Sequence, residues 1–232
     1  MQNSGKEKII DLLEARIKNA EKTMENLIAA ALYSAGTNTL QIGGLQYLVA
    51  DSPTSGTVGG INRATWTFWQ NIAYSSLSTG GAAASVGNIQ QYMNALWVQL
   101  IRGVDRPDLI VADNAYWLLY LGSLQAIQRV ASDKLAQAGF TSLKFMDADV
   151  VPDGGFQGYS SDSTPATGGA PSNHMYFLNT DYIKFRPHRD RNMVPIEPGE
   201  RFSVNQDAMV KIIGFMGNMT ISNCRMQGVL KS

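Results

Sequence analysis

The most regular pattern of apolar and polar positions lies near the N-terminus, between Lys6 and about Ala35. Apolar side chains recur there at steps of three and four residues, which places them on one stripe of a helix. The stripe consists of Ile10, Leu13, Ile17, Ala20, Met24, Leu27 and Ala31. Charged side chains fall mostly off this stripe. The pattern therefore predicts one continuous amphipathic helix, with Ser4 as its cap and Gly36 as its stop.

The predicted partner of this helix is a β-sheet. A coiled coil would need large apolar residues along its whole seam, and Ala20 and Ala31 interrupt that seam. An ordinary amphipathic helix or a short coiled coil is the alternative. We expect four side chains of the stripe to face strands: Leu13, Ile17, Met24 and Leu27.

The middle of the chain alternates between helical and extended patterns. Apolar residues on one face predict a helix over residues 85–103, and a further helix is expected to begin after the N-cap Asp113 and to continue through Ile127. Short strands are expected at residues 109–112, 143–145 and 150–151. This alternation favours an α/β-like region.

A long loop and two strands are expected to complete the chain. Residues 152–173 are rich in Gly, Ser, Thr and Pro, the composition of a surface loop. Residues 175–187 and 208–223 are rich in β-branched and aromatic side chains, which is typical of strands. Together with the helices, these strands indicate an α+β protein.

Charge is distributed unevenly along the chain. Of the 19 basic and 19 acidic residues, ten lie between Lys6 and Glu25, and only Asp51 and Arg63 lie between residues 26 and 101. Interface centres between subunits are depleted of charged residues. We expect part of this uncharged stretch to face another subunit, the alternative being a neutral, solvated surface.

The overall composition excludes several classes of protein. The formal net charge is zero, which argues against a protein whose main role is to bind nucleic acid through its phosphates. Cys224 is the only cysteine, so no disulfide can form within the chain. No apolar run approaches the ~20 residues of a membrane span, and the N-terminus lacks the apolar core of a signal peptide.

Catalytic and metal-binding patterns are weak. His174 and His188 match no zinc-ligand spacing, and Cys224 lies in a strand-like segment without an evident activating partner. Asp147 and Asp149 form a D-x-D pair that is more typical of a solvated turn than of a metal site. The glycines around Gly59 are not followed by the Lys of a phosphate-binding loop. We therefore expect no catalytic residue, no metal and no cofactor.

One basic cluster lies near the C-terminus. It consists of Lys184, Arg186, His188, Arg189 and Arg191. On a strand, alternate residues share one face, so Lys184 and Arg186 are expected side by side. Such a cluster fits a solvated face, neutralised by the nearby Glu197 and Glu200, or a contact with a neighbouring subunit, or a weak contact with packaged DNA.

Two stretches of the chain resemble one known family. They are GGLQYLV followed by GTVGGINRATWTFWQN, and the C-terminal run from Met175 to Leu230 that ends in NCRMQGVL. Both are similar to segments of the major capsid proteins of tailed bacteriophages, whose fold is of the Hong Kong 97 type. Within the first stretch, Arg63 and Trp69 occupy the turn and the aromatic strand of the family pattern.

The resemblance implies a fold, a location and partners. It implies a peripheral domain at residues 1–75, with a long spine helix on antiparallel strands, a mixed α/β axial domain at residues 76–175, and return strands at residues 176–232. The protein would be made in the bacterial cytoplasm and built into the virion, where copies of the chain form pentamers and hexamers beside other virion proteins. The candidate subunit contacts are then Arg63, Trp69, Lys184, Arg186, Arg189 and Arg191.

The chain also departs from the family pattern. The family has an N-terminal arm and an extended loop ahead of the spine helix, whereas the predicted helix begins almost at Met1. A truncated chain or a prophage remnant is therefore expected. Such a chain would form monomers or small rings at micromolar concentration, pentamers or hexamers only at high concentration, and not closed shells. The alternatives are a small α/β enzyme or ligand-binding domain, and a minor or decoration virion protein.

Overall fold

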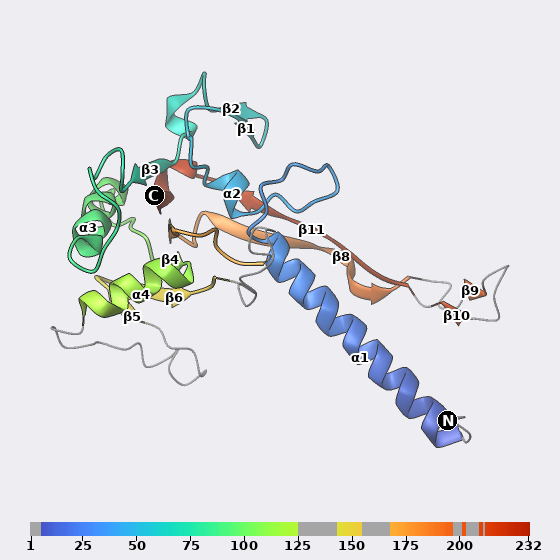
Figure 1. Ribbon diagram of the computed structural model, residues 1–232. Coiled ribbons are helices and arrows are strands. Elements are labelled where there is room, and N and C mark those ends of the chain that lie inside the picture. The colour runs from blue at the N-terminus through green and yellow to red at the C-terminus, as the bar shows by residue number, and fades with distance from the viewer. Residues whose placement is uncertain (1–5, 125–142, 155–167, 197–200, 203–208, 211) are drawn as a thin grey trace. The chain divides into compact units, whose positions relative to one another are not determined.

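The computed structural model describes residues 6–124, 143–154, 168–196, 201–202, 209–210 and 212–232. The chain forms two compact units, each built from two separate stretches of sequence. Unit 1 comprises Met1–Ala29 and Phe185–Asn218, and unit 2 comprises Ala30–Lys184 and Met219–Ser232. Helices and strands both contribute to the fold, as expected for an α+β chain (Figure 1). None of the described helices is long and apolar enough to span a membrane.

A mixed six-stranded sheet forms the centre of unit 2. Its strands lie in the order β3-β12-β7-β4-β6-β5. They are β3 (Ile72–Ser75), β4 (Leu109–Ala112), β5 (Leu143–Phe145), β6 (Ala148–Pro152), β7 (His174–Leu178) and β12 (Gly228–Lys231). The pairs β3–β12 and β4–β6 are parallel, and β7 is antiparallel to both of its neighbours. The strands expected at residues 109–112, 143–145 and 150–151 are confirmed.

The two faces of this sheet are both buried. Ile110, Met175 and Phe177 belong to one apolar core, and their neighbours Val111 and Tyr176 belong to the other. This division follows from the alternation of side chains along a strand. It also explains why MYFL in β7 is a continuous apolar run, since strands covered on both faces lose the polar alternation.

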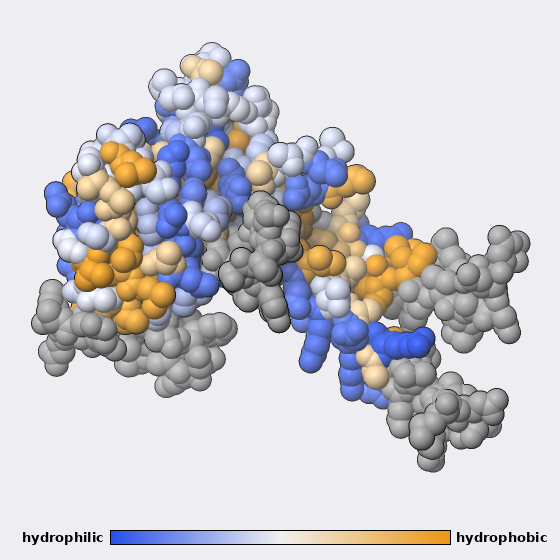
Figure 2. Space-filling view, viewed as in Figure 1, coloured by the Kyte–Doolittle hydropathy of each residue, from blue (hydrophilic) through white to orange (hydrophobic). Residues whose placement is uncertain are grey.

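Helices α3 (Ile89–Leu100) and α4 (Asn114–Ser123) cover one face. The apolar residues predicted for one side of α3 are buried, among them Met93, Leu96 and Leu100 at 0% exposure. The Asp113 carboxylate accepts hydrogen bonds from the backbone N–H groups of Ala115 and Tyr116, which confirms the predicted N-cap. Helix α4 also presents apolar side chains on its outer side (Figure 2). The predicted continuation to Ile127 lies outside the described residues.

Residues 32–71 cover the other face of the sheet and contain only short elements. These are α2 (Leu45–Leu48), β1 (Thr57–Val58), β2 (Ile61–Asn62) and the 3-10 helix η1 (Thr67–Trp69). Leu45, Leu48, Val49 and Val58 supply the apolar side chains of this second core. A second 3-10 helix, η2 (Cys224–Met226), precedes β12.

The long N-terminal helix is present as α1 (Lys6–Ala31), four residues shorter than predicted. The helix ends early because residues 32–34 form hydrogen bonds with other segments of the chain. The Tyr33 hydroxyl donates to Asp153, the Ser34 hydroxyl donates to the Ile42 carbonyl, and the Leu32 carbonyl accepts from the Leu45 N–H. Gly36, at φ +63°, lies in the turn that follows. Ser4, the expected cap, lies outside the described residues.

The predicted burial of α1 against a sheet is not found at the side chains that are described. Leu27 is 65% exposed, so the expectation that it faces strands is wrong. Ile17 and Met24 are half-buried, and no described side chain of α1 from Glu14 onward is fully buried; the side chain of Leu13 is not described. The reason is that periodicity places side chains on one face of a helix but does not determine what covers that face.

The C-terminal strand signals are confirmed with one interruption. The first signal divides into β7 and β8 (Ile183–Pro195), because residues 179–182 form a turn held by Asn179 and Asp108. The second signal becomes β10 (Met209–Val210) and β11 (Ile213–Ile221). Strand β11 pairs with β8, and β10 pairs with β9 (Arg201–Phe202). Phe185 and Phe215 stack with their ring centroids 5.9 Å apart.

Candidate functional site

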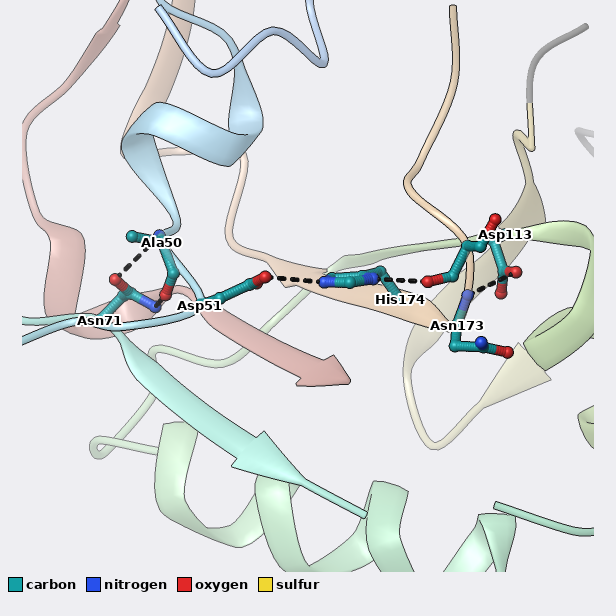
Figure 3. A network of polar contacts seen from close by, with 7 residues as sticks. Ala50, Asp51, Asn71, Asp113, Asn173 and His174 are labelled. Atoms are coloured by element: carbon teal, nitrogen blue, oxygen red, sulfur yellow. Dashed lines mark hydrogen bonds and ion pairs between the residues drawn. The ribbon is translucent and has the colours of Figure 1, made fainter. Parts of the chain in front are cut away.

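A polar network gathers at one end of the unit 2 sheet (Figure 3). Asp113 directly follows β4, His174 opens β7, and Asp51 and Asn71 come from the segment that covers the second face. Because β7 runs antiparallel to β4, the start of β7 lies beside the end of β4. The main-chain N–H of Asp113 donates to the carbonyl of His174 at 3.0 Å. The sheet therefore brings together residues that are far apart in sequence.

His174 and Asp51 form the charged pair of this network. The Nε2 atom of His174 lies 2.9 Å from Oδ2 of Asp51, and its Nδ1 atom lies 2.8 Å from the Ser172 carbonyl oxygen. A carbonyl and a carboxylate can only accept hydrogen bonds. Both ring nitrogens can therefore donate when the imidazole is protonated, and this pair of acceptors favours the protonated form. In this arrangement His174 has no free lone pair with which to accept a proton from a substrate.

The directions of the pKa shifts of His174 and Asp51 agree with this pairing. Burial alone would lower the pKa of His174, but the hydrogen bonds to Asp51 and Ser172 and the charges of Asp51 and Asp113 outweigh burial, so the pKa is raised. Burial alone would raise the pKa of Asp51, but the hydrogen bond and charge of His174 and the charge of Lys231 outweigh burial, so this pKa is lowered. The pair is thus favoured in its ionised form.

The other side chains of the network form hydrogen bonds with backbone groups. The Asn71 side chain bonds both backbone groups of Ala50, at 3.1 and 2.9 Å. Asp113 accepts from the N–H of Asn173 at 2.8 Å, in addition to capping α4. Asn173 itself has a positive φ of 58°, a conformation that Asn tolerates better than most residues. The network therefore joins four loop segments and β7, which is a positioning role.

Replacing His174 by Gln should lower stability in a pH-dependent way. A raised histidine pKa contributes stability that is fully present below its unfolded value of about 6.5 and is lost as pH rises through the folded value. A lowered carboxylate pKa contributes stability that is lost as pH falls through the folded value. The difference in unfolding free energy between wild type and His174→Gln should therefore be largest between about pH 4.5 and 6.5. We expect this difference to be roughly 1 kcal/mol or less, because Asp51 is partly exposed to solvent.

Urea unfolding at several pH values measures this difference. His188→Gln is the matched control, because it removes an exposed histidine on β8 without breaking the pair. A difference for His174→Gln that stays constant from pH 4.5 to 9 would contradict the ionised pair.

Arg63 lies in the interior of unit 2. It is 1% exposed, its Nη2 donates to the Leu48 carbonyl, and its Nη1 lies 3.4 Å from the Tyr47 carbonyl. These carbonyls close α2, where a cation is favourable. Nη2 also lies 4.0 Å from the Cys224 sulfur. Arg63, expected as a subunit contact, is therefore used inside the chain in this structure.

Trp69 lies half-buried in the wall of a surface groove of about 680 Å³. Residues Thr67–Gln70 form one side, and Ser222, Asn223 and Arg225 form the other. The Trp69 indole N–H donates to the Val58 carbonyl at 3.0 Å, which fixes the ring. The side chains of Trp66 and Phe68 stand out into solvent beside it, 53% and 59% exposed.

The basic candidates lie on β8. Lys184, Arg186, Arg189 and Arg191 are all exposed there. The carboxylates expected to neutralise them, Glu197 and Glu200, lie outside the described residues. The roles of these four residues as subunit contacts, and a weak contact with DNA, stay predictions.

The other candidates for chemistry lie elsewhere in unit 2. Asp147 occupies the exposed turn between β5 and β6 and pairs with Arg106 at 3.0 Å, and Asp149 lies on β6. Cys224 is buried, and burial raises the pKa of its thiol despite the opposing effect of Arg63, which disfavours a reactive thiolate. Among the described residues, no group of three or more His, Cys, Asp or Glu side chains could hold a metal ion.

The His174–Asp51 pair was not predicted from the sequence. Its members are 123 residues apart, so no local spacing in the sequence links them. One signal was present, because Asp51 is one of only two charged residues in the stretch from 26 to 101. A lone charge in such a stretch is a candidate for an internal pair.

Comparison with known proteins shows a similarity of fold. No protein-family model matches this chain, and no curated protein matches it. Among solved structures, the chain is similar to one in the structure titled "Cyanophage A-1(L) capsid asymmetric unit". The TM-score is 0.66 at 15% sequence identity, and the likeness covers 95% of this chain and 68% of that chain. The fold is therefore capsid-like over nearly the whole chain.

Proposed function

We propose that this chain is a structural virion protein, a subunit of the capsid shell of a tailed phage or prophage with the Hong Kong 97-type fold. The observation that carries the proposal is the likeness of fold to a chain of a cyanophage capsid over 95% of the present chain. The motifs around Gly59 and from Met175 to Leu230, which resemble the capsid family, support it independently.

The geometry of the polar network also favours a structural protein over an enzyme. His174, which pairs with Asp51, has both ring nitrogens beside acceptors of its own chain. A general base needs a free lone pair within reach of a substrate proton. The division into a peripheral domain at residues 1–75, an axial domain at 76–175 and return strands at 176–232 is part of the proposal, as is location in the virion.

Electron microscopy of the purified chain tests the proposal. We expect a concentration series, with and without a crowding polymer, to yield rings of five or six copies. Analytical ultracentrifugation of the same samples should show discrete species of that size. A chain that stays monomeric over the whole series would contradict a role as a shell subunit.

A further inference from the structure

The surface groove of unit 2 has two walls of different chemistry. Phe68 and Trp69 of η1 form the first wall, and the exposed Trp66 stands beside them. The rings of Trp66 and Phe68 have centroids 5.8 Å apart and planes inclined at 59°, and those of Phe68 and Trp69 lie 6.4 Å apart at 72°. The second wall is polar and consists of Ser222, Asn223 and Arg225. A ligand that fills the groove therefore needs an apolar face and a polar edge.

Hydrogen bonds to the backbone decide what the polar side chains of the groove still offer. Gln70 also lines the groove and donates its Nε2 to the Arg63 carbonyl at 2.7 Å, which leaves its Oε1 as an acceptor. Asn223 accepts the N–H of Arg225 at its Oδ1, at 3.1 Å, which leaves its NH2 group as a donor. The guanidinium of Arg225 adds donors only. The groove therefore presents both acceptors and donors to a ligand.

Three classes of ligand match this lining poorly. A carboxylate or phosphate only accepts hydrogen bonds, so it would give the Oε1 of Gln70 no donor. A nucleic acid brings a negative charge with every nucleotide, whereas Arg225 is the only charged side chain among the described residues that line the groove. A wholly apolar ligand would take Asn223 and Arg225 out of water without replacing their hydrogen bonds, which is unfavourable.

We propose that this groove binds a neutral oligosaccharide of a few pyranose rings. Each hydroxyl group of a sugar both donates and accepts hydrogen bonds, as the polar side chains require, and the C–H face of a pyranose ring is apolar and packs on an aromatic ring. The groove volume of about 680 Å³ lies within the range of about 300–1,000 Å³ for small-ligand sites. Because the aromatic planes are inclined to one another, they form a corner for single rings and not a flat platform. The site would be additional to a role in the shell.

Titration of the purified chain with defined sugars, followed by NMR, tests the proposal. The neutral probes are cellotetraose, chitotetraose and maltotetraose. The charged probes are cellotetraose oxidised to a carboxylate at every C6, and a thymidine tetranucleotide. The indole N–H resonances of Trp66 and Trp69 report on the groove, and those of Trp97 and Trp117, which lie in or against the core, are internal references. We expect saturable shifts of the groove resonances with at least one neutral tetramer, which should bind more tightly than both charged probes.

A first variant removes the aromatic wall. Trp66→Ala, Phe68→Ala should weaken binding of the neutral tetramer by about ten-fold or more, as when an aromatic side chain that stacks on a ring of the ligand is removed. Leu118→Ala is the matched control, because Leu118 is as exposed as Phe68, at 59%, and does not line the groove. Both variants should keep the melting temperature of wild type, which separates a lost site from a lost fold.

A second variant changes one donor of the polar wall. Asn223→Asp keeps the oxygen that accepts the Arg225 N–H but replaces the NH2 donor by an acceptor. Binding of the neutral tetramer should weaken roughly five-fold, the ratio that corresponds to one hydrogen bond. Asn38→Asp is the matched control, because the Oδ1 of Asn38 also accepts from the N–H two residues further on, at 3.0 Å, and Asn38 does not line the groove.

Four results would overturn the proposal. They are the absence of shifts with all three neutral tetramers, tighter binding of a charged probe, sugar binding that the groove variants leave unchanged, and loss of ring assembly in the Trp66→Ala, Phe68→Ala variant without any sugar binding by wild type. The last result would assign the groove to a contact between subunits.

The same measurements separate this inference from the proposed function. Rings without sugar binding would overturn the sugar site and leave the shell role standing. Sugar binding without rings would support the site and contradict only the shell role.

Discussion

Replacement of Gly44 by alanine is expected to destabilise unit 2 by roughly 3 kcal/mol, because the added methyl group overpacks backbone that cannot easily move. A Cβ at this position would lie 2.3 Å from the Ser34 nitrogen and 2.6 Å from the Leu32 carbonyl oxygen. The close approach exists because the Leu45 N–H donates to that carbonyl at 2.7 Å, and the Gly44 N–H donates to the Ser34 hydroxyl. The methyl group would separate the two segments that these hydrogen bonds join.

Gly87→Ala is the matched control for this variant. An added Cβ there meets nothing within 4 Å, and the position has no positive φ. Its stability should stay within about 0.5 kcal/mol of wild type or rise slightly, since alanine restricts the unfolded chain. Denaturant unfolding followed by circular dichroism measures both variants. Equal stabilities for Gly44→Ala and Gly87→Ala would show that residues 32–45 rearrange freely.

Truncation of Leu96 to alanine is expected to lower the unfolding free energy by about 2–5 kcal/mol, the range for deleting a buried leucine side chain. Leu96 is 0% exposed on α3 and packs close to Gly228 of β12, where an added Cβ would lie 3.2 Å from Leu96. The cavity left by the truncation would therefore open between the helix and the centre of the sheet.

Val98→Ala provides the control on the same helix. Val98 is 69% exposed, so its truncation should change stability by only about 0.5 kcal/mol. The comparison requires the unfolding transition of unit 2, because two compact units can unfold in separate steps. A loss for Leu96→Ala no larger than that for Val98→Ala would contradict the assignment of α3 to the core.

Local features of unit 2 were predictable because their causes are local. The stripe of α3, the apolar strand at residues 109–112 and the Asp113 cap all depend on side chains within a few residues of one another. The division of the last strand signals was not predictable, because the turn at residues 179–182 is held by Asp108 and by Gln227. Both partners come from other parts of the chain.

The candidate surfaces show the same contrast. The weakly charged stretch from residue 26 to 101 was visible in the sequence, and part of it lines the surface groove that contains the predicted Trp69. Arg63, predicted beside it as a contact, is buried under the α2 carbonyls. A charged residue in a turn is usually exposed, but the approach of residues 47 and 48 and of Cys224 encloses this one.

The sequence by itself determined where the longer helices and the buried strands of the middle region form, which side chains share a face, and which stretch lacks charge. These properties follow from the periods of the helix and strand and from composition. Only the tertiary structure decided that β12 lies between β3 and β7, that His174 meets Asp51, and that Leu27 of α1 remains exposed. Each depends on segments distant in sequence, whose pairing is set by the packing of the whole unit and leaves no periodic signal in either segment.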